Sequence, residues 1–268
     1  MTLLETQGLT RRYQGLVAVD AVDLVLPEGG VHAVIGPNGA GKTTLFNMLS
    51  GLVTPSAGRI LFETTDITAW PAHRRAGLGI ARTFQNIRLF GAMTVLENAL
   101  TGLHPQLHSG LGAVLARLGR FRAEERHAVA RARAALDFVG LAASADQQAG
   151  GLAYGDQRRL EIARAIAQSP RLLLLDEPAA GMNPAETEAL ARLVRRIADQ
   201  GTTVLLVEHD MGFVMGLSDS VTVLNFGRTI FVGRPAAMRG DPAVVEAYLG
   251  ARLAAKLRVL HDREAARS

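Results

Sequence analysis

Cysteine is absent from the 268-residue sequence, which excludes disulfide bonds, thiolate metal sites and thiol catalysis. Long hydrophobic runs are absent too. Apolar stretches such as residues 172–175 and 204–207 fall far short of the roughly 18–20 residues that cross a bilayer, so we expect no membrane-spanning segment. The N-terminus lacks a basic region followed by an apolar core, so no secretory signal is predicted and the cytosol is expected.

Lysine is scarce, since Lys42 and Lys256 are the only two, and arginine supplies nearly all of the positive charge. The net charge of +4 is a modest excess that identifies no partner. Six arginines crowd one segment: Arg117, Arg120, Arg122, Arg126, Arg131 and Arg133. Glu124 and Glu125 interrupt this run, and Phe121 is the aromatic residue within it. A solvated helix face is therefore favoured over a nucleic-acid or lipid-binding patch.

The hydrophobic and charged fractions, 48% and 20%, are those of a folded globular protein. Strand patterns alternate with helical patterns, which favours a parallel α/β sheet. The strands are expected at residues 31–35, 59–63, 80–84, 171–175, 203–207, 221–224 and 229–232. At the start of the chain, segments 22–26 and 31–35 flank Gly29 and Gly30, which predicts a hairpin and an antiparallel β lobe.

A stretch at about residues 92–168 carries long helical patterns and no convincing strand pattern. We predict that it forms a helical subdomain inserted in the core of one domain spanning residues 3–250. The tail, residues 251–268, is expected to form a short helix with leucines on one face and basic residues among them. Packing of this helix on its own domain is favoured over a membrane-surface role.

The segment GPNGAGKTT, residues 36–44, matches the phosphate-binding P-loop pattern between a predicted strand and a predicted helix. Backbone N–H groups of such a loop, with the N-terminal end of the following helix, cradle a polyphosphate. Lys42 would reach the β and γ phosphates, Thr43 would bind Mg²⁺, and Thr44 would cap the helix or touch a phosphate. The other loop residues predicted to bind ATP are Gly36, Asn38, Gly39, Ala40 and Gly41.

Two adjacent carboxylates, Asp176 and Glu177, follow a continuous apolar strand. A buried parallel strand with acids at its C-terminal end is typical of a ligand-facing sheet edge, although a surface acidic turn would give the same letters. Beside a P-loop, Asp176 is predicted to hold Mg²⁺ through a water molecule, and Glu177 to polarise the attacking water. His209 follows another apolar strand, where an imidazole could contact the γ phosphate or orient Glu177.

Taken in order, the segments GPNGAGKTT, FQNIRLF, LAYGDQRRLEIARA, LLLLDEP, AAGMNP and VEHD resemble the ATPases of ABC transporters. The resemblance covers about residues 3–250. It implies an α/β P-loop NTPase fold with a RecA-like core, an N-terminal antiparallel β lobe and an α-helical subdomain. It also implies ATP hydrolysis with Mg²⁺, in a dimer with a second ATPase subunit that is a copy of this chain or a paralogue.

By the same resemblance, Tyr13 is expected to stack on adenine and His209 to be the switch histidine. Gln85 would contact Mg²⁺ or the attacking water and sense the membrane partner. Residues 152–157 match the signature motif, which closes over the ATP held by the opposite subunit. The signature positions predicted to bind nucleotide are Ala153, Tyr154, Gly155 and Asp156.

The chain departs from the common signature wording at three of these positions. Ala153 replaces a serine, so a hydroxyl to the γ phosphate is missing, and Tyr154 and Asp156 replace glycine and glutamine. Asn183 stands where the D-loop, the loop after the acidic pair, usually has aspartate. Backbone N–H groups at the helix start can still bind phosphate, so ATPase activity is expected to survive.

The wording of three segments, ARTFQNIRLFGAMTVLENAL, LAYGDQRRLEIARA and DEPAAGMNP, is most similar to the bacterial importers of branched-chain amino acids. This implies transmembrane permease subunits, a periplasmic binding protein that acts indirectly, and a peripheral position on the cytoplasmic face of the inner membrane. Nucleic acid is not expected. Urea and amide importers, lipid exporters, soluble non-transport ABC proteins and a catalytically dead regulatory cassette stay open as alternatives.

Overall fold

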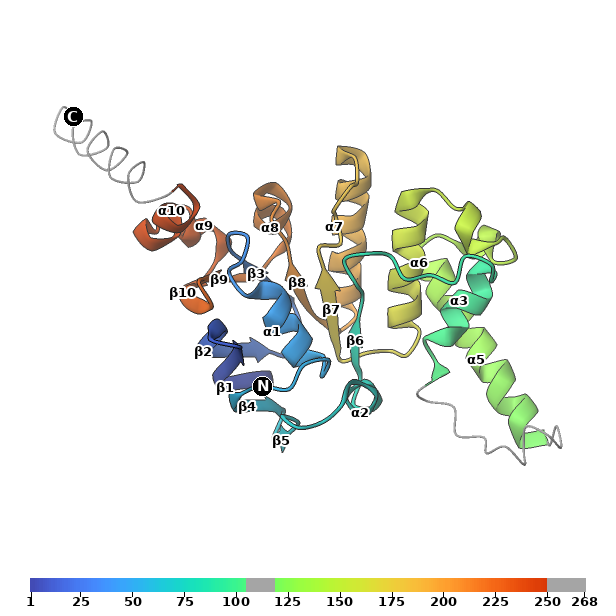
Figure 1. The fold of residues 1–268 in the computed structure, drawn as a ribbon. Helices are drawn as coiled ribbons and strands as arrows, with labels where there is room; N and C mark the ends of the chain where they lie inside the picture. The colour runs from blue at the N-terminus through green and yellow to red at the C-terminus, as the bar shows by residue number, and fades with distance from the viewer. Residues whose placement is uncertain (105–118, 250–268) are drawn as a thin grey trace. The chain divides into compact units, whose positions relative to one another are not determined.

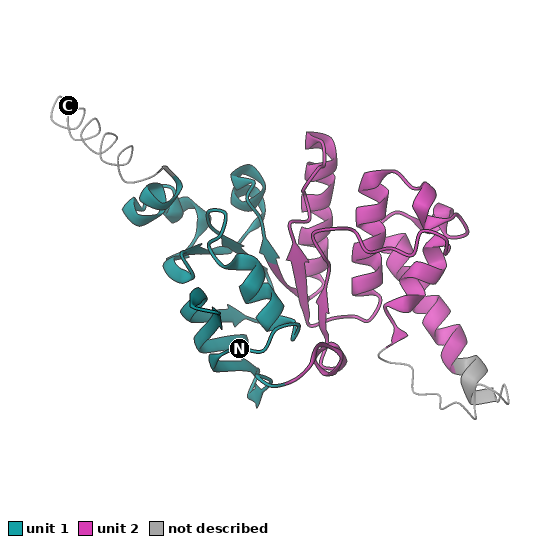
Figure 2. Ribbon diagram, in the orientation of Figure 1, with its two compact units in different colours: residues 1–69, 206–268 teal, residues 70–205 magenta. Residues whose placement is uncertain are grey.

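A computed structural model of the chain describes residues 1–104 and 119–249 (Figure 1). The tail predicted at residues 251–268 lies outside the described residues. The chain forms two compact units, residues 1–69 with 206–268 and residues 70–205 (Figure 2). Strand β8 (Thr203–Val207) continues from the second unit into the first. Each unit is described separately below.

The first unit contains an antiparallel sheet in the order β2-β1-β4-β5. Its strands are β1 (Thr2–Tyr13), β2 (Leu16–Pro27), β4 (Ala57–Phe62) and β5 (Thr65–Asp66). Burial alternates along the second half of β2, where Val22, Leu24 and Leu26 are buried and the residues between them are exposed. One face of the sheet therefore packs on a core and the other faces solvent, as expected for an N-terminal antiparallel lobe.

The prediction of a hairpin between residues 22–26 and 31–35 is wrong. Strand β2 pairs with β1, whereas β3 (Val31–Ile35) pairs in parallel with β9 (Ser220–Asn225). All five residues of β3 are buried, so the strand requires cover on both faces, which an amphipathic hairpin does not provide. Gly29 and Gly30 both have positive φ and turn the chain away from β2.

The remaining elements of the first unit follow the P-loop or lie near the C-terminus. They are α1 (Lys42–Leu49), α8 (Met211–Leu217), β10 (Arg228–Gly233), α9 (Pro235–Met238) and α10 (Pro242–Leu249). Strand β10 pairs antiparallel with β9. Helix α9 packs against both of these strands, and α10 packs against β10.

The second unit contains the parallel pair β6 (Ile80–Arg82) and β7 (Leu172–Asp176). Strand β6 is shorter than the expected segment 80–84, because the backbone N–H of Phe84 bonds to Glu161 rather than to β7. The other elements are α2 (Ala72–Gly77), α3 (Val95–Thr101), α5 (Gly119–Phe138), η2 (Ala142–Ser144), η3 (Ala149–Gly151), α6 (Tyr154–Ile166) and α7 (Pro184–Asp199).

Helices α3, α5 and α6 pack on one another and form a group within the second unit (Figure 1). Thr94 and Glu97 form a capping box that fixes the start of α3. The group lies inside the stretch 92–168 for which helices were predicted. Within residues 1–104 and 119–249, none of the helices is both long enough and apolar enough to cross a membrane.

Candidate nucleotide site

The loop between β3 and α1 has a backbone that only glycine can adopt at two positions. Gly36 has φ +152°, and a Cβ atom there would lie 2.1 Å from the carbonyl oxygen of Leu224. Gly41 has φ +100°, and its Cβ would lie 2.3 Å from the carbonyl oxygen of Ala18. The loop therefore packs tightly against neighbouring backbone and turns directly into α1. Gly41 has no side chain that could cap this helix start, which favours an anionic ligand there.

Lys42 opens α1 and is 8% exposed. Its Nζ atom donates to the carbonyl oxygens of Gly36 at 2.7 Å and Pro37 at 3.0 Å. The ammonium group therefore crosses the loop and stabilises its curled shape. Thr43 and Thr44 follow in the first turn of α1, where Thr43 is exposed and Thr44 is half-buried.

Helix α10 lies near the P-loop in the same unit. A cavity of about 560 Å³ is lined by P-loop residues 37–40, the β9–β10 turn and α10. Burial raises the pKa of the Tyr248 hydroxyl to about 12, while a hydrogen bond with the backbone of Gly36 acts in the opposite direction. Sequence reasoning did not connect α10 with the P-loop, because no motif marks a helix that lies near a loop only in the folded chain.

Two other predicted residues of the first unit lie at element ends. Tyr13 is the last residue of β1 and is partly exposed, and the Arg11 guanidinium lies 4.5 Å from its ring centroid. A partly exposed ring at a strand end suits stacking on a base. His209 follows β8 with an exposed side chain, and its backbone N–H donates to the buried Glu208 carboxylate at 3.1 Å. Asp210 then caps α8.

In the second unit, the acidic pair ends β7. Asp176 is 4% exposed, and its Oδ2 accepts a hydrogen bond from Arg82 Nη2 at 2.8 Å. Arg82 is the last residue of the neighbouring strand β6, and its side chain is 8% exposed. A carboxylate removed from water needs such a partner. Sequence reasoning missed Arg82, because the two residues are 94 positions apart and only the β6–β7 register brings them together.

Replacing Arg82 with methionine is expected to destabilise the protein by about 3 kcal/mol, because it leaves the buried Asp176 carboxylate without this cation. Urea unfolding of the full chain measures the change. The double variant Arg82→Met with Asp176→Asn should recover most of the loss. Arg192→Met is the control: its ion pair with Glu188 is largely exposed and should contribute less than about 1 kcal/mol. Equal effects of the two arginine variants would contradict the prediction.

Gln85 and Glu177, both predicted to act in catalysis, lie together in the second unit. Gln85 Nε2 donates to Glu177 Oε2 at 2.8 Å. Glu177 has φ +45°, which is unusual for a residue with a Cβ atom and is found preferentially at functional sites. Glu177 thus adopts a backbone conformation that its residue type does not favour.

The signature residues form the start of α6. Ala153 is the N-cap residue, and no side chain caps the helix there. Asp156 pairs with Arg159 one turn further along. Gly155 is buried, and a Cβ atom there would lie 3.0 Å from the Glu186 carboxylate. The helix start thus keeps the uncapped N–H groups through which phosphate binding was predicted.

Asn183, in the predicted D-loop, caps helix α7. Its Oδ1 accepts from the backbone N–H of Glu186, and the Glu186 carboxylate accepts from the Asn183 N–H, both at 3.0 Å. Asparagine is as good an N-cap residue as aspartate. The departure at this position therefore preserves the local structure.

A buried ionic cluster on α6 was also missed. Arg158 and Glu161 are 0% and 1% exposed, and their side chains pair at 2.9 Å. Burial raises the pKa of the Glu161 carboxyl group, and the nearby Arg158 and Arg164 guanidiniums act against this rise. Both residues share the buried face of α6 with Gly155 and Ile162. Charged residues at apolar helical positions are a signal that could have identified the cluster.

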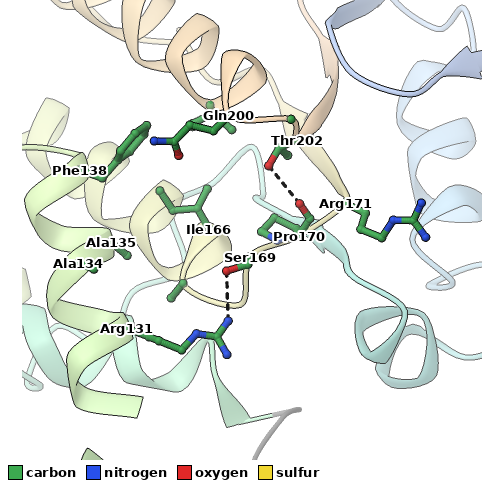
Figure 3. Close-up of a pocket in the computed structure, with 13 residues that line it drawn as sticks. Arg131, Ala134, Ala135, Phe138, Ile166, Ser169, Pro170, Arg171, Gln200 and Thr202 are labelled. Atoms are coloured by element: carbon green, nitrogen blue, oxygen red, sulfur yellow. Dashed lines mark hydrogen bonds between the residues drawn. The ribbon is translucent and has the colours of Figure 1, made fainter. Parts of the chain in front are cut away.

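A second cavity, of about 540 Å³, lies within the second unit (Figure 3). Arg131 and Phe138 of α5 line it together with residues around the start of β7 and the end of α7. Arg131 donates to Ser169 Oγ at 3.3 Å, and Thr202 donates to the carbonyl of Pro170 at 3.1 Å. None of the residues predicted to bind nucleotide lines this cavity.

Among the described residues, no group of three or more histidine, aspartate and glutamate side chains could hold a metal ion alone. The donors predicted for Mg²⁺ are instead a hydroxyl, an amide and a single carboxylate. Oxygen donors of this kind suit Mg²⁺, which keeps several waters and binds substrate phosphates.

Two family models match parts of the chain. A family model described as "ABC transporter" matches residues 19–180, and one described as "Branched-chain amino acid ATP-binding cassette transporter" matches residues 228–254. The chain is 47% identical over 249 residues to the high-affinity branched-chain amino acid transport ATP-binding protein LivG of Escherichia coli K12. It is equally similar to BraF of Pseudomonas aeruginosa; each match covers 92% of this chain and 98% of the relative.

Other similarities extend to an export protein and to solved structures. The lipopolysaccharide export system ATP-binding protein LptB of Acidithiobacillus ferridurans is 36% identical, over 92% of this chain and 97% of the relative. A nucleotide-free ATP-binding cassette of an ABC transporter superposes with a TM-score of 0.81 at 33% identity, covering 92% of this chain and 99% of that one. A cassette in its ADP conformation gives 0.81 at 32% identity, covering 93% and 99%. These likenesses confirm the expected fold class.

Proposed function

The chain belongs to the ATP-binding cassette family of transporter ATPases, and from this premise we propose that it powers the import of branched-chain or related amino acids. One observation carries the choice of cargo: the chain is 47% identical, over nearly its whole length, to proteins named for branched-chain amino acid transport. The family model that matches residues 228–254 is also named for branched-chain amino acid transporters, which supports this choice.

The P-loop is proposed to bind the phosphates of ATP. Its glycines and backbone N–H groups form the cradle, because the close contacts at Gly36 and Gly41 fix the curl of the loop. Lys42 exchanges its bonds to the loop carbonyls for bonds to the β and γ phosphates. Tyr13 stacks on adenine, and Arg11 steadies its ring from one side.

Thr43, Gln85 and Asp176 are proposed to hold Mg²⁺ together with phosphate oxygens and water. Bound Mg²⁺ neutralises charge that develops on the transferred phosphoryl group. Arg82 holds the Asp176 carboxylate at the end of β7 and so presets its position. Asp176 then keeps one oxygen for a water of the ion, as expected for a hard cation that dehydrates reluctantly.

Glu177 is proposed to orient and polarise the water that attacks the γ phosphate, with Gln85 holding the carboxylate. His209 supports the reaction by contacting the γ phosphate. The signature residues Ala153, Tyr154, Gly155 and Asp156 contact the ATP of a second ATPase subunit, either a copy of this chain or a paralogue. Hydrolysis therefore depends on dimerisation.

The partners are proposed to be permease subunits that span the membrane, with a periplasmic binding protein that delivers the amino acid and does not touch this chain. The ATPase then lies on the cytoplasmic face of the membrane as a peripheral subunit. No nucleic-acid partner is proposed: Glu124 and Glu125 interrupt the arginine run, and Arg126 and Arg133 are exposed on α5.

Co-purification tests this assembly. Membranes of the source cells that express the tagged Glu177→Gln variant are solubilised with ATP present, and mass spectrometry identifies the accompanying chains. Multi-spanning permease chains with a second ATPase support the proposal; ribosomal or DNA-bound partners overturn it. In proteoliposomes with the binding protein, leucine should stimulate ATP hydrolysis, whereas stimulation by urea or lipopolysaccharide alone would overturn the proposed cargo.

A further inference from the structure

Glu177 lies in a closed ring of hydrogen bonds formed entirely within the second unit. The first bond of the ring runs from Gln85 Nε2 to the Glu177 carboxylate at 2.8 Å. From the backbone carbonyl of Gln85, the ring continues into helix α6. It returns to Glu177 through the loop that follows β7. Each link joins two segments that lie in different sequence motifs.

The second link is the guanidinium of Arg158. Its Nη2 atom donates to the carbonyl oxygen of Gln85 at 2.9 Å, and its Nη1 atom donates to that of Phe84 at 2.8 Å. Glu161 pairs with the same guanidinium and also accepts from the Phe84 N–H at 3.3 Å. Because Arg158 is fully buried, these bonds fix the Gln85 segment to α6 without competition from water.

The third link is the hydroxyl of Tyr154. It accepts from Arg158 Nη2 at 3.3 Å and donates to the carbonyl oxygen of Ala180 at 2.9 Å. Its ring lies in van der Waals distance of the position a Cβ on Gly181 would take, 3.5 Å away. Tyr154 therefore joins α6 to the loop after β7, a contact that glycine, the usual residue at this signature position, could not make.

The backbone closes the ring. The N–H of Ala180 donates to the carbonyl oxygen of Glu177 at 3.2 Å. Glu177 itself holds φ +45°, a conformation that costs free energy for a residue with a Cβ atom and persists only where its surroundings enforce it. The ring thus contacts Glu177 at two points. Gln85 binds its carboxylate, and the N–H of Ala180 binds its backbone carbonyl.

We propose that Tyr154 and Arg158 are positioning residues that hold Glu177 of their own subunit in its reactive orientation through this ring. The inference rests on the proposed role of Glu177 as the residue that polarises the attacking water. It assigns Tyr154 a second function, in addition to the predicted contact with the partner subunit's nucleotide. Closure of the signature residues on that nucleotide would then act on Glu177 through two hydrogen bonds.

The two functions of Tyr154 predict different kinetics. A residue that positions Glu177 affects the chemical step, so its loss lowers kcat and leaves KM nearly unchanged. A residue that only binds the partner's ATP affects binding, so its loss raises KM. Tyr154→Phe separates these outcomes, because it removes the hydroxyl and keeps the ring.

Tyr154→Phe is expected to lower kcat for ATP hydrolysis by the full-length protein about threefold to tenfold, the range of one neutral hydrogen bond, with KM within about twofold of wild type. Hydrogen exchange of the amides in residues 177–183 should become faster, while exchange in α1 stays unchanged. A raised KM with unchanged kcat, or unchanged exchange in residues 177–183, would overturn the inference.

Arg158→Lys provides the second test. Lysine keeps the charge opposite Glu161 but cannot bridge two carbonyls and a hydroxyl, so kcat should fall about tenfold. If both residues act through one ring, the double variant should lose less than the product of the single losses; multiplicative losses would contradict a shared ring. Arg192→Lys, at an exposed position of α7, is the matched control and should leave kcat unchanged.

The exchange measurement separates this inference from the proposed function. If the wild-type protein hydrolyses no ATP, the proposed function fails. Hydrogen exchange of the amides in residues 177–183 does not depend on ATP hydrolysis, so it still reports whether the ring exists. If hydrolysis is normal in both variants, the proposed function stands and the positioning role fails.

Discussion

Glu177→Gln is expected to lower kcat for ATP hydrolysis by about 10²- to 10⁴-fold, the range for loss of a general base, and to leave ATP affinity within about threefold of wild type. Glutamine has nearly the same shape, and its Oε1 can accept the hydrogen bond that Gln85 Nε2 now donates to the carboxylate. The local structure is thereby kept, while the group loses the charge that polarises water. The variant should consequently retain unhydrolysed ATP.

Phosphate release in the steady state gives kcat, and nucleotide that stays with the protein through gel filtration shows the trapped ATP. Glu188→Gln is the matched control, because its side chain is largely exposed on α7 and should not affect turnover. A kcat within tenfold of wild type would contradict the assignment of Glu177. It would indicate that another group, with His209 the first candidate, orients the water.

The P-loop and the acidic pair could be predicted from the sequence because their chemistry depends on contiguous residues. Gly36 and Gly41 are required by backbone contacts that no other residue type permits. The glycine pattern in the sequence is therefore sufficient to predict the loop. Asp176 ends a strand whose residues are all buried, and a continuous apolar run predicts such a strand. In both cases local sequence and local structure determine each other.

The contacts around these motifs could not be predicted, because they join distant segments through the backbone. Arg82 meets Asp176 only through the register of β6 on β7. Arg158 binds carbonyl oxygens of Phe84 and Gln85, and every residue type carries a carbonyl, so no sequence pattern marks the partner. The wrong hairpin at Gly29 has the same origin, since a turn signal does not specify which sheet the next strand joins.

Asn183 shows the opposite situation, in which a departure from the family wording has a local explanation. The residue caps α7, and asparagine performs this role as well as aspartate. At Ala153 nothing replaces the hydroxyl of the usual serine, because a methyl group cannot cap the start of α6. Nucleotide binding at this position must then rely on backbone N–H groups.

Lys42→Ala is expected to raise the Kd for ATP about 10- to 100-fold, because it removes charge-assisted hydrogen bonds to the β and γ phosphates. The free protein should be affected as well. Lys42 Nζ bonds to the carbonyl oxygens of Gly36 and Pro37, so its loss leaves the curled loop without this internal support. We expect a decrease in unfolding free energy of about 1–2 kcal/mol.

Titration with a fluorescent ATP analogue measures the Kd. Urea unfolding in the absence of nucleotide measures the free energy of unfolding. Arg228→Ala removes an exposed cation of the same unit, which pairs with Asp20, and should change the Kd less than about twofold. Wild-type ATP affinity in Lys42→Ala would contradict the P-loop assignment. A large loss of affinity without loss of stability would instead show that Lys42 acts on the phosphates alone, and that the packing of Gly36 and Gly41 suffices to hold the loop.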